Sequence, residues 1–215
     1  MATFAFECVG ARGEEFAVTP TLAFAVRISE STGTGVHALA LRCQIRIEPH
    51  RRRYSPDEGE RLADLFGDPS RWANTQRPMH FATVATMVPG FTGEVEVAVP
   101  VPCSYDLEVA STRYFDALDD GPIPLLLLFS GTAFLHDGPG YAVQQLPWTA
   151  EARYAMPATV WREMVQRDFP DSGWLRCSRR TLDALGRYKT RHALPTWESA
   201  IESLLAAAEV PLTEE

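Results

Sequence analysis

The stretch from Ile123 to Leu135 constrains the fold of this chain more than any other. Its centre, Leu125–Phe129, is an unbroken apolar run that Pro124 opens and Gly131 interrupts. The run is too short to cross a bilayer, which needs about 20 apolar residues. Because a half-buried strand alternates polar and apolar residues, an unbroken run predicts a central strand that is covered on both faces.

Alternating patterns on either side of this strand predict an antiparallel β-rich body. Residues 21–29 and 36–48 each place apolar side chains on one face, and the Gly-rich segment 31–35 between them is typical of a hairpin loop. Residues 81–88 and 93–101 repeat the pattern around Pro89-Gly90. We therefore expect a β-sandwich-like arrangement.

Charged residues on the outward faces of two of these strands suggest how the strands are arranged. Arg42 and Arg46 face away from the apolar side of the strand over 36–48, and Glu94 and Glu96 do the same in a later strand. If the two strands are neighbours, these four side chains form cross-strand ion pairs.

The segment Ser55-Pro56-Asp57-Glu58 predicts the start of a helix. Ser55 is a good N-cap, proline suits the first helical position, and Glu58 completes a capping box. Gly67 follows the last apolar residue at helical spacing and suits a C-terminal cap. A short helical insertion near residues 55–67 is the consequence.

The pattern changes after Pro147-Trp148. Apolar stripes at helical spacing run over residues 157–168, from Ser178 to about Arg191, and after Thr196. We expect an α+β protein: an antiparallel β-rich domain at 1–147, and a helical C-terminal region at 148–215 packed on it. The pattern over residues 105–118 leaves both strand and helix open.

Composition excludes several classes of protein. The chain has 215 residues and a net charge of −8, which opposes non-specific binding to nucleic acid or to an anionic membrane. The N-terminus lacks the basic and apolar regions of a signal peptide. The four cysteines form no CxxC motif, which favours reduced thiols in a cytoplasmic protein.

Catalytic and cofactor motifs are missing from the sequence. Ser130-Gly131 follows a strand, but Phe129 stands where a nucleophile elbow needs glycine. Cys43 lies on an apolar strand face, where cysteine is usually a small hydrophobe rather than a metal ligand. No glycine-rich phosphate loop precedes a helix. We therefore predict no catalytic residues, no metal ligands and no cofactor.

Two basic clusters remain as candidate partner-binding residues. A protein partner with an acidic surface suits them better than RNA does, given the negative charge of the whole chain. Tryptophans, which often anchor interfaces, are also plentiful. The candidates are Arg51, Arg52, Arg53 and Tyr54 in the first cluster, and Arg176, Arg179, Arg180, Arg187 and Arg191 in the second.

Several strings, taken together, resemble an uncharacterised family of high-GC bacterial proteins over nearly the whole chain. They include Leu41-Arg-Cys-Gln-Ile-Arg-Ile-Glu-Pro, Arg51-Arg-Arg-Tyr-Ser-Pro, Met87-Val-Pro-Gly-Phe-Thr-Gly and Ser172-Gly-Trp-Leu-Arg. That family is associated with gene neighbourhoods of uptake [NiFe]-hydrogenases. The resemblance implies a setting rather than a reaction, and it transfers no catalytic residues.

The sequence thus predicts a non-enzymatic cytoplasmic binding or assembly protein, an accessory factor for a redox enzyme such as a [NiFe]-hydrogenase. Its partner would be a hydrogenase subunit or maturation factor. One alternative is a small-molecule or metal-binding module with a pocket between the sheet and the C-terminal helices. A third reading, an RNA-contacting protein, predicts binding that weakens steeply with salt.

Overall fold

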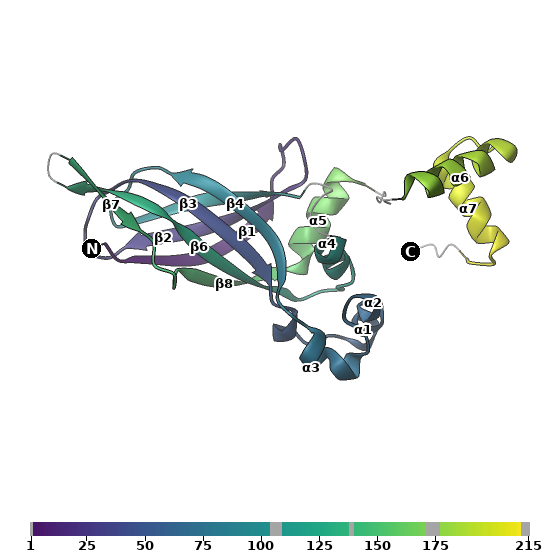
Figure 1. Ribbon diagram of the computed structural model, residues 1–215, viewed down its shortest axis with the longest axis horizontal. Helices are drawn as coiled ribbons and strands as arrows, with labels where there is room; N and C mark the ends of the chain where they lie inside the picture. Colours follow the sequence, from purple (N-terminus) through teal and green to yellow (C-terminus); the bar gives the residue numbers. More distant parts are fainter. Residues whose placement is uncertain (1, 104–108, 138–139, 171–176, 212–215) are drawn as a thin grey trace. The chain divides into compact units, whose positions relative to one another are not determined.

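The computed structural model describes residues 2–103, 109–137, 140–170 and 177–211. The chain divides into two compact units, Met1–Asp171 and Ser172–Glu215. Figure 1 shows the strands gathered in the first unit, and helices α6 and α7 forming the second.

The described residues of the first unit form eight strands and several short helices. The strands are β1 (Phe4–Gly13), β2 (Thr21–Glu30), β3 (Val36–Ile47), β4 (Met79–Val88), β5 (Glu94–Pro102), β6 (Pro122–Asp137), β7 (Gly140–Gln145) and β8 (Glu151–Pro157). The α-helices are α1 (Pro56–Arg61), α2 (Ala63–Phe66), α3 (Trp72–Thr75), α4 (Val109–Asp116) and α5 (Ala158–Asp168), and 3-10 turns occupy Pro49–Arg51 and Pro69–Arg71.

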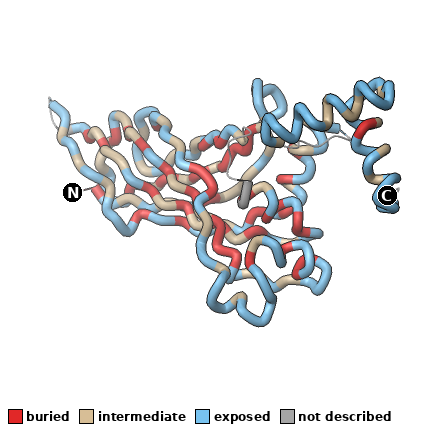
Figure 2. The backbone as a smooth tube through the Cα atoms, turned by 45° about the vertical axis from the view of Figure 1, so that its right-hand side comes forward, coloured by how far each residue is buried: buried red, intermediate tan, exposed pale blue. Residues whose placement is uncertain are grey.

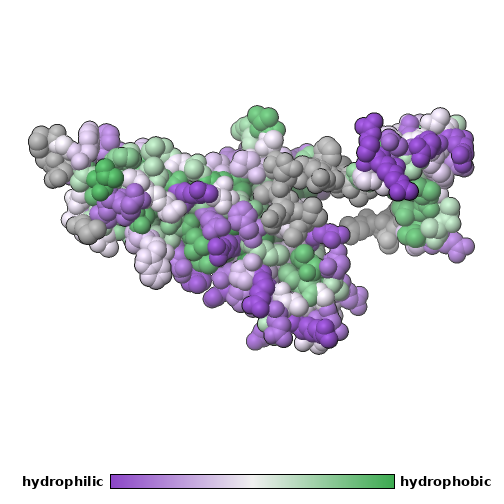
Figure 3. Space-filling model, in the orientation of Figure 1, coloured by the Kyte–Doolittle hydropathy of each residue, from purple (hydrophilic) through white to green (hydrophobic). Residues whose placement is uncertain are grey.

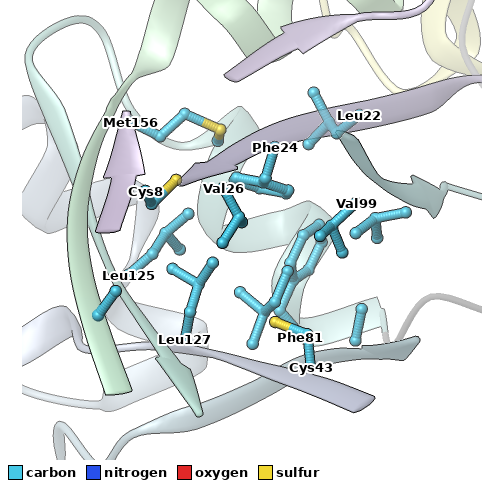
Figure 4. Close-up of a cluster of buried hydrophobic side chains, with 14 of the residues drawn as sticks. Cys8, Leu22, Phe24, Val26, Cys43, Phe81, Val99, Leu125, Leu127 and Met156 are labelled. Atoms are coloured by element: carbon cyan, nitrogen blue, oxygen red, sulfur yellow. The ribbon is translucent and has the colours of Figure 1, made fainter. Parts of the chain in front are cut away.

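The strands form two antiparallel sheets. The smaller sheet has the order β1-β2-β5, and the larger has the order β4-β3-β6-β7, with β8 also paired to β6. Inward-facing side chains of both sheets form one apolar core, in which Phe24 and Val99 of the smaller sheet meet Phe81 and Leu127 of the larger (Figure 4). Each fully buried side chain of this size contributes about 1.5–3 kcal/mol. The expected α+β fold with a β-sandwich-like body is confirmed.

Strand β6 is the central strand of the larger sheet, as the apolar run predicted. Leu125, Leu127 and Phe129 are buried in the core, whereas Leu126 and Leu128 are only half-buried on the outer face. The prediction that both faces are covered is therefore wrong for this face. An apolar run shows that both faces of a strand carry apolar side chains, but it does not show how far each face is covered. A half-buried outer face is compatible with the same run.

The helical insertion begins as expected. The backbone N–H of Glu58 donates to the Ser55 side chain at 3.1 Å, and the N–H of Ser55 donates to the Glu58 carboxylate at 3.0 Å. Gly67 ends α2 with φ at +74°, a conformation that favours glycine. The predicted capping box and insertion are both present.

The outward charges pair differently from the prediction. Strand β5 lies beside β2 rather than β3, so Glu94 and Glu96 contact Arg27, at 3.4 and 3.7 Å. The nitrogens of Arg27 also approach Glu7 in β1 at 3.1 Å. The sequence pattern identifies the outward face of each strand but not its neighbour. Arg42 and Arg46 are thereby left without these glutamates.

The chain after Pro147 also contributes to the β body. Strand β8 pairs with β6 from Pro122 to Leu128, and α5 follows it within the first unit. We expected the helical region to start at residue 148, but the two units divide at Asp171. The alternation of Ala152, Tyr154 and Met156 was the missed strand signal. The predicted packing of the C-terminal helices on the sheet stays a prediction.

The second unit is a pair of helices, α6 (Arg179–Arg191) and α7 (Trp197–Ala207). Ser178 and Thr196 cap them, each accepting a backbone N–H from three residues later, at 3.1 and 3.0 Å. Among the described residues of this unit, only Ala200 is fully buried. Figure 2 shows most of the backbone of the unit as exposed. Two helices of this size bury little apolar surface between them.

The segment that the sequence left open contains a helix. Helix α4 covers Val109–Asp116, and Tyr114 and Phe115 on it are completely buried. Residues 104–108 of the open segment lie outside the described residues. No helix in the described parts of the chain is both long and apolar enough to span a membrane.

Candidate partner-binding surface

Arg52, from the first basic cluster, is an internal structural residue. Its side chain is 6% exposed and forms an ion pair with the buried carboxylate of Glu58. One guanidinium nitrogen donates to the Pro122 carbonyl at 3.0 Å. The side chain therefore ties the helical insertion to the turn that leads into β6, and its two terminal guanidinium nitrogens are engaged inside the protein.

The Tyr54 hydroxyl is also hydrogen-bonded within the protein. It donates to the Pro49 carbonyl at 2.7 Å and lies 2.9 Å from the Tyr114 hydroxyl. Burial raises the pKa of both phenols, that of Tyr114 to about 12, so both stay protonated at neutral pH. Only Arg51 and Arg53 of the first cluster are exposed, and Arg51 is 3.6 Å from Glu48.

The second cluster lies on helix α6, where four arginines are exposed: Arg179, Arg180, Arg187 and Arg191. Arg176 lies outside the described residues. Arg179 and Leu182 are three residues apart, and Arg187 and Arg191 are four apart, so each pair lies on one face of the helix. Arg179 pairs with Asp183 at 3.3 Å. Within the described residues, the guanidinium groups of Arg187 and Arg191 have no carboxylate partner.

Helix α7 places an aromatic side chain beside α6. The Tyr188 hydroxyl lies 2.8 Å from that of Ser203, which fixes the two helices in register. Trp197, at the start of α7, is 47% exposed and stands beside Gly186. The Lys189 ammonium lies 5.7 Å from the centre of the indole ring, within range of a cation–π contact.

These residues surround an open hollow of about 810 Å³. Its lining is Arg179, Leu182, Asp183, Gly186, Arg187, Thr190, Arg191 and Trp197. Figure 3 shows strongly hydrophilic side chains over α6 next to a hydrophobic area over α7. We call this lining the α6–α7 surface. It combines an exposed indole and leucine with arginines, and can accept an apolar side chain flanked by carboxylates.

An apolar stripe on α7 continues from Trp197. Ile201 and Leu204 follow at helical spacing and are also exposed. These residues belong to the apolar stripe that the sequence predicts after Thr196. The structure leaves the stripe open within the second unit.

Two buried thiols and a pair of neighbouring histidines lie in the first unit. Burial raises the pKa of Cys8 to about 11 and that of Cys43 to about 12, so these thiols are protonated at neutral pH. The rings of His37 and His136 meet edge to face, and both lie near the Tyr141 ring, with ring centres 4.5 to 5.8 Å apart. Among the described residues, no three His, Cys, Asp or Glu side chains are grouped to hold a metal ion.

Comparison with solved structures gives only distant likenesses. A β-glucosidase from Kluyveromyces marxianus aligns with 72% of this chain and 15% of its own, at 8% identity and a TM-score of 0.26. β-Glucosidase 3B from Thermotoga neapolitana, in complex with α-D-glucose, aligns with 72% and 17%, at 13% identity and a TM-score of 0.26. Nothing about this chain follows from scores so low.

Comparison by sequence identifies the protein family. No curated protein matches the chain. A family of unknown function, DUF6084, matches residues 1–212, which is nearly the whole length. The chain therefore belongs to the DUF6084 family.

Proposed function

We propose that this protein is a non-enzymatic cytoplasmic accessory factor that binds another protein through the α6–α7 surface. The observation that carries the proposal is the grouping of Arg187, Arg191 and Trp197 around one hollow. Arginine and tryptophan are the residues most enriched at the energetic centres of protein interfaces. Two of these side chains have charges that nothing in the described residues neutralises.

The charge of α6 indicates the chemistry of the partner. This helix carries five basic residues and one acidic residue, in a chain whose net charge is −8. A partner segment with carboxylates around an apolar side chain complements both the arginines and Trp197. RNA would meet the same arginines, but the acidic remainder of the chain would repel it.

The family resemblance gives the first partner to test. We propose a [NiFe]-hydrogenase subunit or one of its maturation factors, because of the gene neighbourhoods associated with the resembling family. The alternative reading, a small-molecule or metal-binding module, stays a prediction. Native mass spectrometry and elemental analysis of the purified chain would address it directly.

The test is affinity purification of the tagged full chain from its native host under hydrogenase-expressing conditions. It compares wild type with Arg187→Glu/Arg191→Glu and with the control Arg180→Glu, an exposed arginine of α6 that does not line the hollow. We expect a hydrogenase protein with wild type and control, and at least ten-fold less with the double variant.

Two results would count against the proposal. If the double variant recovers the partner as well as wild type does, the α6–α7 surface is not the binding site. If no hydrogenase protein is recovered with wild type, the partner assignment fails. Direct titration of the recovered partner with the purified variants then separates loss of affinity from loss of expression.

A further inference from the structure

The outer face of the larger sheet contains a second hollow, of about 330 Å³. It is lined by Arg42 and Gln44 of β3, Thr83 of β4, and Leu128, Phe129 and Ser130 of β6. In the pairing register Arg42 is opposite Ser130, and Gln44 is opposite both Thr83 and Leu128. Three hydrogen-bonded strands therefore fix the backbone positions from which these side chains extend, which favours a preorganised site.

Arg42 is an arginine without a counter-charge. Among the described residues, no carboxylate lies within ion-pair distance of it, and its cross-strand neighbours are Ala85 and Ser130. Arg27 occupies a comparable place on the other sheet, and there three glutamates surround it. The contrast shows that a central arginine on a sheet face is neutralised in one sheet of this protein and left open in the other.

The neighbours of Arg42 offer further donors. The Ser130 hydroxyl has no hydrogen-bond partner among the described residues. The Gln44 amide oxygen accepts from Arg46 at 3.2 Å, which leaves the amide N–H groups available. Thr83 is less free, because its hydroxyl lies 2.9 Å from His80 Nε2. A guanidinium, a hydroxyl and an amide nitrogen thus line one small space, and all three are able to donate hydrogen bonds to a ligand.

The hollow coincides with a break in the pairing of β6. Strand β8 pairs with β6 as far as Leu128, and β7 pairs from Thr132 onward. Between them, the Phe129 N–H donates to the Ala150 carbonyl at 2.8 Å, and the Leu146 N–H to the Gly131 carbonyl at 2.9 Å. Ser130 lies inside this break and is exposed. Its small side chain leaves room beside the longer Arg42 and Leu128.

We propose that this hollow binds a carboxylate group. Arg42 presents a planar pair of N–H donors that matches the two oxygens of a carboxylate. Ser130 and Gln44 donate to the remaining lone pairs, and Leu128 contacts the attached carbon chain. At 330 Å³ the space is at the small end of ligand sites. It suits a carboxylate with a few carbons, either a free acid or the end of a glutamate side chain of another protein.

The experiment titrates the full-length protein, ¹⁵N-labelled, and follows amide shifts of β3 and β6 by NMR. The probes are propionate, its neutral counterpart propionamide, inorganic phosphate, and a short peptide with one glutamate and blocked ends. We expect propionate or the peptide to shift residues around Arg42 and Ser130 in a saturable way. Propionamide should not bind, and phosphate should bind at least ten-fold more weakly.

Variants assign the binding to the hollow. Arg42→Gln should weaken carboxylate binding at least ten-fold, and Ser130→Ala should weaken it severalfold. The control is Arg53→Gln, which makes the same change of charge at an exposed arginine outside the hollow and should bind as wild type does. The spectra of the variants themselves show whether each one is folded.

The outcomes separate the sources of the carboxylate. Binding of propionate supports a free acid, whereas binding of the peptide alone supports a glutamate side chain of a partner. The proposal is overturned if neither binds, if Arg42→Gln binds as wild type does, or if phosphate binds as well as propionate. Because Arg187→Glu/Arg191→Glu leaves this hollow unchanged, its result is independent of the test of the α6–α7 surface.

Discussion

Gly131, in the middle of β6, is a position where a single methyl group should be strongly destabilising. Its φ is +149°, and a Cβ built there would lie 2.0 Å from the Ala40 carbonyl oxygen of β3. The obstacle is backbone rather than a flexible side chain. Gly131 is paired with Leu41 on one side and accepts the Leu146 N–H on the other, so neither edge can move alone.

The expected cost of Gly131→Ala has two parts. The backbone conformation costs an ordinary residue about 1–3 kcal/mol. Moving β6 far enough from β3 to relieve the overlap weakens two or three ladder hydrogen bonds, each worth about 0.5–1.5 kcal/mol. The two parts add to about 2–7 kcal/mol, a large share of the typical 5–15 kcal/mol that stabilises a folded protein.

Gly33→Ala is the matched control. Gly33 also has a positive φ, +78°, but a Cβ there meets nothing within 4 Å. Only the conformational cost of about 1–2 kcal/mol applies. Urea unfolding of both variants and wild type, followed by far-UV circular dichroism, gives the free energies of unfolding. If Gly131→Ala is within 0.5 kcal/mol of Gly33→Ala, about the limit of such comparisons, the steric argument is wrong.

Three further changes test the interior contacts. Arg52→Met should lower the free energy of unfolding by about 3–5 kcal/mol, because it leaves the Glu58 carboxylate buried without its ion pair. Urea unfolding measures this loss, and a loss below about 1 kcal/mol, the contribution of an exposed ion pair, would contradict the prediction. Burial acts to raise the pKa of Glu30, but its hydrogen bonds from the Thr32 hydroxyl and from backbone N–H groups outweigh that and lower it to about 2. The free energy of unfolding of wild type should therefore exceed that of Glu30→Gln by its full amount above pH 4.5, and this difference should be lost as the pH falls toward 2. A difference that does not depend on pH would refute the reasoning. Tyr54→Phe should cost about 1–3 kcal/mol because Tyr114 loses its partner, and adding Tyr114→Phe in a double-mutant cycle should cost little more.

Local features of the fold were predictable from the sequence because neighbouring residues determine them. The capping box at Ser55 and Glu58 needs only residues within one helical turn. The buried faces of β2, β3 and β5 follow from alternation, since side chains in a strand point to opposite sides. Strand order was not predictable, because alternation carries no information about which strand is adjacent. That is why Arg42 was assigned to the wrong partners.

The candidate site was predictable only in part, for a related reason. The sequence shows that Arg52 and Arg187 are both basic and both lie near turns or helix surfaces. It does not show that Glu58 and the Pro122 carbonyl come within reach of Arg52 through long-range packing. Among the described residues Arg187 has no such contact, and its side chain lines the α6–α7 surface. Whether an arginine is structural or free depends on residues far away in the chain.

The pairing of β6 has a consequence for how the protein acquires its structure. One edge of this strand pairs with β3, which is synthesised much earlier, and the other pairs with β8 and β7, which follow it. The leucine-rich run therefore leaves the ribosome before its second edge can be filled. Non-local pairing of this kind is slow, on the order of milliseconds to seconds. During that interval Leu126 and Leu128 border an open strand edge, so a chain ending at Gln145, without β8, should aggregate where the full chain folds.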